Sequence, residues 1–346
     1  MNLPPSASAA PPAAPRKRTP ILPIALGCLG VAALGCIAIL GFGWWLDNQR
    51  KAAYAAGHEA YLAGDCSRAI SSFDEVLESD SDLNSEEAQK ASAERQECAD
   101  FQAAAGSQAA GRYGEALLAY SQFQDSYPDS PLSGKVLDQT AALFSEAAPD
   151  AVANAVVCQE ADALAQRGLI PDPAANLPPL LFACGAQYEA AQQFTEAIAV
   201  YERVRQEFAD HPVAEQVEEA LARTILAEAQ TFGAGALPAP QSLGGTGTGP
   251  AVVIIQNDSP ERLSLVFNGA ELRVETLEPC ATCQNYTGDG PDACPEQGPI
   301  GTYTVPPGDY EVVVRSLSDT SVSPFRGTWS LASGDEYYSC FFLVSR

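Results

Sequence analysis

The residues best suited to chemistry in this 346-residue chain are its cysteines, since it holds ten of them against two histidines and one methionine. Eight of the ten lie outside the apolar stretch 21–46, four in a helix-like region and four in a strand-like region. Cysteines in such numbers form disulfides in oxidising surroundings or bind a soft metal ion such as zinc. The eight are Cys66, Cys98, Cys158, Cys184, Cys280, Cys283, Cys294 and Cys340.

The first four of these cysteines are spaced symmetrically about two predicted turns. Cys66 and Cys98 are equally far from a loop near residue 82. Cys158 and Cys184 stand at comparable distances from a Pro-rich turn near residue 172. In an antiparallel helix pair, residues equidistant from the turn face each other within disulfide reach. The spacing therefore predicts two disulfides, Cys66–Cys98 and Cys158–Cys184, with unpaired core cysteines as the alternative.

The other four cysteines leave their pairing open. Cys280 and Cys283 form a C-x-x-C motif, and Cys294 and Cys340 follow at long intervals. Three disulfide connectivities are possible for four cysteines. A zinc site built from Cys280, Cys283, Cys294 and Cys340 is the alternative, but structural zinc sites normally pair two C-x-x-C motifs and only one is present. We therefore expect two disulfides here, with neither a metal nor another cofactor.

The histidines give no sign of catalysis. His58 lies inside a predicted helix and His211 in a loop beside a proline, and neither has a nucleophile near it in the sequence. No nucleophile elbow, phosphate-binding lysine loop or H-E-x-x-H motif is present. The sequence therefore predicts a protein that is not an enzyme and has no catalytic residues.

The charge balance limits the partners. The chain holds 44 acidic against 19 basic residues, which gives a formal net charge of -25. An acidic surface of this kind repels phosphate backbones, so we expect no nucleic-acid partner.

The uncharged stretch 21–46 is long enough to cross a bilayer as one helix. Trp44 and Trp45 close it, as is usual for residues at the headgroup interface, and residues 16–18 before it are all basic. This pattern predicts a single-pass membrane protein with a cytoplasmic N-terminus and an extracytoplasmic bulk, where disulfides persist. Residues 1–20 are expected to form a disordered Pro/Ala-rich tail. A cleaved signal peptide or a lipoprotein signal is the alternative.

Residues 47–231 have helical patterning with a repeated unit. Three stretches each combine a small residue, an alanine in the next helix, an aromatic four residues later and an apolar residue three further on. Small residues let two helices approach closely, and the aromatic and apolar positions fill the seam between them. The positions are Gly57, Ala69, Phe73 and Val76; Ala104, Ala116, Tyr120 and Phe123; Gly185, Ala197, Tyr201 and Val204.

This unit resembles the tetratricopeptide repeat, although the units lie further apart than the usual ~34 residues. The gaps predict an overlong helix over 84–110, two degenerate helices near 134–147 and 150–167, and a Pro-rich interruption at 170–180. The resemblance implies a helical solenoid whose concave surface binds peptides or partner proteins.

The C-terminal part changes character. Residues 232–250 are rich in Gly and Pro and predict a flexible linker. Residues 251–346 hold short β-branched and aromatic runs separated by turn signals, typical of a small β-sandwich that holds the last four cysteines. The runs are 251–257, 262–269, 270–277, 301–305, 309–317, 326–331 and 336–344.

Together these features predict an α + β multidomain chain with a single transmembrane helix, a tetratricopeptide-like solenoid and a C-terminal β-sandwich. The expected function is a non-catalytic, membrane-anchored scaffold of the cell envelope, of bacterial type, that binds an unidentified protein partner. One alternative is an envelope module whose β-domain grips glycan or cell wall, with the repeats as a spacer. A second alternative is a cytoplasm-facing repeat protein with a zinc-bound C-terminal domain.

Overall fold

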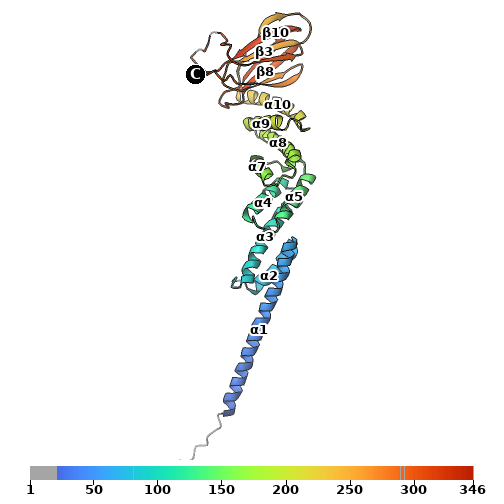
Figure 1. Cartoon of the computed structure of the whole chain (residues 1–346), viewed down its shortest axis with the longest axis vertical. Helices are drawn as coiled ribbons and strands as arrows, with labels where there is room; N and C mark the ends of the chain where they lie inside the picture. Colours follow the sequence, from blue (N-terminus) through green and yellow to red (C-terminus); the bar gives the residue numbers. More distant parts are fainter. Residues whose placement is uncertain (1–21, 81, 289, 292, 346) are drawn as a thin grey trace, which may run out of the picture. The chain divides into compact units, whose positions relative to one another are not determined.

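The computed structural model describes residues 22–80, 82–288, 290–291 and 293–345, with side chains from residue 41 (Figure 1). Within these residues ten helices precede eleven strands, which makes the fold α + β. The predicted disordered tail, residues 1–20, lies outside the described part of the chain.

The chain forms two compact units, residues 1–98 and 99–346. The division falls within helix α3 (Glu86–Ala109), the overlong helix that the repeat spacing predicts.

In the first unit, α1 (Leu22–Ala63) and α2 (Cys66–Ser79) form a close helical pair. The pair turns at Gly64, whose φ of 77° favours glycine, and the Asp65 side chain then caps α2 by accepting the N–H of Arg68. Any side chain at Gly57 would run into the ring of Phe73, which is fully buried. The predicted small–aromatic pair is therefore the closest point of the seam.

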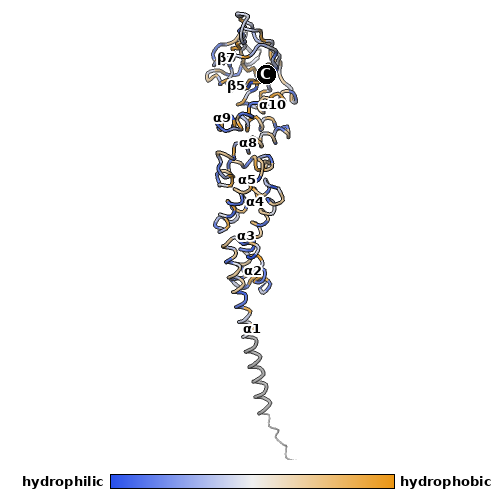
Figure 2. Tube along the Cα trace, turned by 90° about the vertical axis from the view of Figure 1, so that its right-hand side faces the viewer, coloured by the Kyte–Doolittle hydropathy of each residue, from blue (hydrophilic) through white to orange (hydrophobic). Residues whose placement is uncertain are grey.

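No helix among the described residues combines the length and the apolar character needed to cross a membrane. The described side chains of α1 begin at Gly41, and Asp47, Arg50 and Lys51 follow within three turns, so hydrophilic residues interrupt this part of the helix (Figure 2). The predicted transmembrane helix over 21–46 is wrong by this finding, and with it the single-pass localisation. Residues 21–40 of that stretch lie outside the described side chains.

The second unit begins with helices that supply the next repeat-like seam. They are α4 (Tyr113–Ser126), α5 (Ser133–Glu146), α6 (Pro149–Val152) and α7 (Ala155–Gln166). The predicted seam residues Ala116, Tyr120 and Phe123 are all buried. Burial raises the pKa of Tyr120 to about 12, since the phenolate would be poorly solvated there.

Three further helices follow: α8 (Pro173–Ala190), α9 (Phe194–Glu207) and α10 (Ala214–Phe232). The Pro-rich interruption expected over 170–180 is largely helical, because Pro173 takes the first position of α8 and Pro178 and Pro179 continue the helix. A proline at the first helical position loses no intrahelical bond.

Two mixed sheets build the C-terminal region, in the orders β1-β9-β8-β4-β5 and β2-β10-β3-β7. Their inward side chains form one buried core around Trp329, Phe267 and Tyr310. The strands are β1 (Gly235–Ala236), β2 (Gln241–Gly245), β3 (Ala251–Asn257), β4 (Leu263–Asn268), β5 (Leu272–Leu277), β6 (Tyr286–Thr287), β7 (Ile300–Val305), β8 (Gly308–Ser316), β9 (Phe325–Leu331), β10 (Asp335–Phe341) and β11 (Val344–Ser345). The last of these pairs with β6 in a separate two-stranded ladder.

The segment predicted as a flexible linker, 232–250, supplies an edge strand to each sheet. Strand β1 pairs in parallel with β9, and β2 pairs with β10. Between them, the carbonyl of Pro238 accepts the indole N–H of Trp329 at 2.9 Å. The Gly- and Pro-rich composition therefore serves close backbone approach as well as turning, which composition alone does not reveal.

Helix α10 covers the outer face of β4, β5 and β8, and Figure 1 shows it directly beside the strands. Val266, Val274 and Val313 are buried on that face, which explains why β4 and β8 are buried on both sides. The outer edge of β5 is closed as well. The N–H of Val274 donates to Glu218 and its carbonyl accepts from Arg205. Side chains from α9 and α10 thus satisfy an edge that would otherwise invite another strand.

Candidate binding cleft

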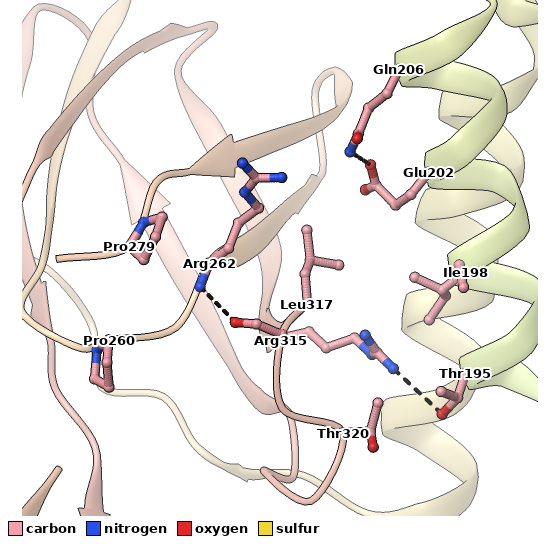
Figure 3. Close-up of a pocket in the computed structure, with 12 residues that line it drawn as sticks. Thr195, Ile198, Glu202, Gln206, Pro260, Arg262, Pro279, Arg315, Leu317 and Thr320 are labelled. Atoms are coloured by element: carbon pink, nitrogen blue, oxygen red, sulfur yellow. Dashed lines mark hydrogen bonds between the residues drawn. The ribbon is translucent and has the colours of Figure 1, made fainter. Parts of the chain in front are cut away.

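A cleft of about 440 Å³ lies between α9 and the loops at one end of the sheets (Figure 3). Its volume falls within the range of ligand pockets. One wall is a single face of α9, because its residues recur at helical spacing. The opposite wall comes from the segment before β4, the segment after β5, and the end of β8 with the loop that follows it. The lining residues are Thr195, Ile198, Ala199, Glu202, Gln206, Pro260, Arg262, Pro279, Arg315, Leu317, Ser318 and Thr320.

A buried ion pair fixes the base of the cleft. Arg315 on β8 places its Nε 2.6 Å from Glu228 Oε2 on α10, and both side chains are less than a tenth exposed. The same guanidinium donates to the Ser316 carbonyl and contacts the Thr195 hydroxyl across the cleft at 3.5 Å. These contacts hold α9 and α10 against the sheet. Removing either Arg315 or Glu228 would leave the other charge buried and unpaired, which is strongly destabilising.

The helical wall is equally fixed. Glu202, which is 6% exposed, accepts from Arg205 at 2.8 Å and from the Gln206 amide at 3.2 Å. Arg205 also donates to the Thr276 hydroxyl of β5 at 2.5 Å. The polar side chains of this wall are therefore occupied, while Ile198 and Ala199 give it an apolar surface.

Arg262 is a charged donor that the cleft leaves available. Its backbone N–H donates to Ser318, and its guanidinium donates to Glu278 at 2.9 Å. Among the described side chains, Glu278 is the one acceptor in hydrogen-bond contact with this guanidinium, which has five N–H groups. Figure 3 shows the Arg262 side chain extending along the cleft on the side opposite Glu202. Arg262 can therefore donate to an oxygen of a bound molecule.

The described lining of the cleft consists of apolar, hydroxyl, amide and charged side chains. Its described lining holds no histidine and no cysteine. His211 lies in the turn before α10, where its Nδ1 accepts the N–H of Val213. In the first unit, His58 on α1 contacts Glu94 on α3 at 2.9 Å. Each histidine therefore has a hydrogen-bond partner within its own unit.

The eight cysteines form four pairs at disulfide distance. Cys66–Cys98 joins α2 to α3, and Cys158–Cys184 joins α7 to α8, which are the two pairs that the symmetric spacing predicts. Their Cα atoms are 5.0 and 5.4 Å apart. In the C-terminal region the two cysteines of the C-x-x-C motif pair with each other, as Cys280–Cys283. The fourth pair, Cys294–Cys340, joins a loop to β10. The four-cysteine zinc set is therefore divided between two disulfides.

Several residues that matter here were not found from the sequence. Arg262 and Arg315 are charges within strand-forming runs, and Glu228 is an acid on a helix like many others in this chain. The one available signal is that Arg315 directly follows the run Val312–Val314, where an outward arginine in a buried strand needs a partner.

Comparisons with known proteins add little. No family model matches the chain, and no curated protein gives a significant match. Among solved structures, the crystal structure of the S-layer protein rSbsC(31-844) is similar at 14% identity and a TM-score of 0.22. That likeness covers 82% of this chain but 45% of the S-layer protein, and at this TM-score it supports no conclusion about fold or function. The tetratricopeptide resemblance stays a prediction.

Proposed function

We propose that this protein is a non-catalytic scaffold that binds a partner polypeptide, and that the cleft between α9 and the sheets holds an apolar segment of that partner. The observation that supports this most is the combination of an apolar surface on the α9 wall with Arg262, a guanidinium whose remaining N–H groups face the cleft. Pockets that orient a peptide combine apolar surface with a few placed donors in this way.

The rigid walls favour this function. Arg315, Glu228, Glu202 and Arg205 are held by one another and by the backbone, so the cleft is formed before a ligand arrives. A preformed site spends little binding energy on ordering its own side chains.

The charge of the chain narrows the partner. A net charge of -25 attracts a basic protein and repels an acidic one. Within the cleft, the Arg262 guanidinium would donate to a backbone carbonyl or a carboxylate of the bound segment. The partner is therefore expected to be basic overall, with a short apolar stretch that carries an oxygen acceptor.

The alternative in which the β-region binds a ligand and the repeats act only as a spacer gains no support. Residues 99–346 form one compact unit, and α10 is packed on the sheet through the Arg315–Glu228 pair. The binding surface proposed here needs both the helix and the strands.

The test is a peptide selection on the full chain, using a displayed random library. Selected peptides are then measured against Ala199→Trp, which fills the cleft from an exposed position on α9, and against Ala141→Trp, a matched exposed position on α5. We expect Ala199→Trp to abolish binding and Ala141→Trp to leave it unchanged. Arg262→Ala should weaken binding about 10- to 100-fold, as for the loss of a charge-assisted hydrogen bond.

Equal binding by wild type and Ala199→Trp would place the peptide elsewhere and refute the cleft as the site. Failure to select any peptide above background would count against the binding function itself.

A further inference from the structure

The carboxylate of Asp258 is completely buried beside the Cys294–Cys340 disulfide. Its Oδ2 lies 3.3 Å from Cys294 Sγ and 3.8 Å from Cys340 Sγ. Sulfurs in a disulfide carry no hydrogen, so neither can donate to this oxygen. No N–H or O–H group of the described residues donates to Oδ2 either. A buried carboxylate oxygen without a donor is costly and needs an explanation.

The other oxygen of Asp258 fixes the direction of the carboxylate. Oδ1 accepts the backbone N–H groups of Gln297 and Gly298, at 2.9 and 2.5 Å, and the side-chain amide of Gln256 at 3.2 Å. Gln256 in turn accepts the hydroxyl of Tyr338. Any side chain at residue 298 would collide with the backbone there, so this close approach requires glycine. These bonds aim Oδ2 at the two sulfurs.

The three atoms are arranged like the ligands of a small tetrahedral ion. Asp258 Oδ2 and the sulfurs of Cys294 and Cys340 all lie within 4.8 Å of one another. Around a zinc ion with bonds of about 2.3 Å to sulfur and 2.0 Å to oxygen, neighbouring ligand atoms are about 3.5 to 3.8 Å apart. The two oxygen–sulfur distances already match this spacing. Only the sulfur–sulfur separation must increase, and reduction of the disulfide allows that.

We propose that Cys294, Cys340 and Asp258 form a thiol-dependent site for a divalent ion of the zinc class, with the disulfide and the metal-bound form as alternatives. Water would fill the fourth position. The carboxylate oxygen that lacks a donor beside the disulfide gains a thiol donor on reduction, and a metal bond when the ion binds. The hydrogen bonds to Oδ1 would serve as the supporting shell that orients a metal ligand.

The chemistry balances with a dithiol as reductant. The dithiol gives two electrons and two protons to the Cys294–Cys340 bond and becomes a disulfide itself. The ion then displaces the two thiol protons and binds two thiolates and the carboxylate. Both cysteines are partly exposed whereas Asp258 is not, so a reductant can reach the sulfurs.

This site differs from the zinc set that the cysteine spacing suggests. Cys280 and Cys283 pair with each other and are replaced by Asp258, which precedes Cys294 by 36 residues. The spacing between cysteines cannot reveal Asp258, because this carboxylate lies in the connection between β3 and β4.

The test uses the full chain, reduced with dithiothreitol, freed of reductant without oxygen and titrated with Co²⁺ as a spectroscopic probe for zinc. We expect one Co²⁺ per reduced chain with a sulfur-to-cobalt absorption band, and none for the oxidised chain. Asp258→Asn, in which every disulfide can still form, should weaken binding at least about tenfold. The double variant Cys280→Ser/Cys283→Ser should bind as wild type does, and Cys294→Ser/Cys340→Ser should not bind.

Three results would overturn the proposal. The first is a reduced wild-type chain that binds no Co²⁺. The second is binding that survives Cys294→Ser/Cys340→Ser but is lost in Cys280→Ser/Cys283→Ser, which would place the ion at the other pair. The third is binding unaffected by Asp258→Asn, and this result remains decisive even where the cysteine variants fail to fold.

Discussion

The disulfides of the helical region and those of the β-region are placed by different rules. Cys66–Cys98 and Cys158–Cys184 each join two helices consecutive in the chain or nearly so, and their distances from the turn determine which residues meet. In the β-region, Cys294–Cys340 connects the loop before β7 to β10, with three strands between them in the chain. Asp258, whose carboxylate contacts both sulfurs, comes from a third segment. Helical packing is encoded by local spacing, whereas the β-region depends on contacts between distant residues.

The ion pairs differ as well, because Arg315–Glu228 is buried between a helix and the sheet whereas Asp125–Arg167 is exposed. The variant Glu228→Ala should have the largest effect on stability. This change leaves Arg315 charged and buried, so we expect the free energy of unfolding to fall by about 3–5 kcal/mol. Chemical denaturation of the second unit measures the loss. Asp125→Ala, which breaks the exposed pair with Arg167, should cost less than about 1 kcal/mol.

A compensating double variant sharpens this result. Glu228→Leu combined with Arg315→Met removes both charges together and should recover most of the stability. If the double variant is as unstable as Glu228→Ala, the loss comes from packing and the ion pair has little part in it.

Removal of disulfides should distinguish the two regions next. The Cys158–Cys184 bridge spans 26 residues, and loop-closure entropy predicts a loss of about 3.5 kcal/mol for Cys158→Ser/Cys184→Ser. Cys280–Cys283 spans 3 residues, so Cys280→Ser/Cys283→Ser should cost about 2 kcal/mol. Urea unfolding of both variants gives the comparison, and a larger loss for the short bridge would contradict the entropic explanation.

Substitution of two helical glycines should change the stability in opposite directions. A Cβ at Gly185 would collide with the ring of Tyr201, so Gly185→Val should destabilise by about 1–3 kcal/mol. Gly106 on α3 has no atom near its Cβ position, and Gly106→Ala should stabilise by about 0.5–1 kcal/mol. A melting temperature that is unchanged or higher for Gly185→Val would mean that the small residue is not needed for the seam.

The smallest effect concerns the turn between α2 and α3. The side chain of Asp80 accepts from Ser85 and Asn84, and these hydrogen bonds lower its pKa to about 2. A lowered pKa stabilises the turn above the ordinary pKa of an aspartate, near 3.8, and the contribution is lost as the pH falls toward 2. Amide exchange at Ser85, corrected for intrinsic rates, should accelerate over that range. Asp80→Asn should remove the pH dependence, and its persistence would exclude Asp80 as the cause.

Much of the fold follows from periodicity. The seam residues Ala69, Phe73 and Val76 are buried, and so are their equivalents in the other two repeats. Small and aromatic residues that recur at helical spacing encode this burial. The seven strand-forming runs lie at β3–β5 and β7–β10, since β-branched residues between turn signals encode strands locally. Both features depend only on neighbours in the sequence.

The features that the sequence did not predict depend on tertiary contacts, or lie in segments whose composition suggested a different structure. The apolar stretch 21–46 gave a membrane helix that the described residues do not support. The Gly-rich stretch 232–250 suggested flexibility where strands pair. Arg315 with Glu228, and Asp258 with Cys294, meet across separations of 87 and 36 residues, which no local pattern encodes.

The cleft exists only if α9, α10 and the five-stranded sheet behave as one body, and native-state hydrogen exchange tests this directly. Amides in α9, α10, β4 and β8 are followed by mass spectrometry at increasing urea concentration. We predict that these four elements lose protection together, with one opening free energy. The Arg315–Glu228 pair and the hydrogen bonds of Glu218 and Arg205 to the edge of β5 link the helices to the sheet. If α9 and α10 exchange at lower urea while β4 and β8 stay protected, the cleft is not a preformed site and the proposed binding function loses its structural basis.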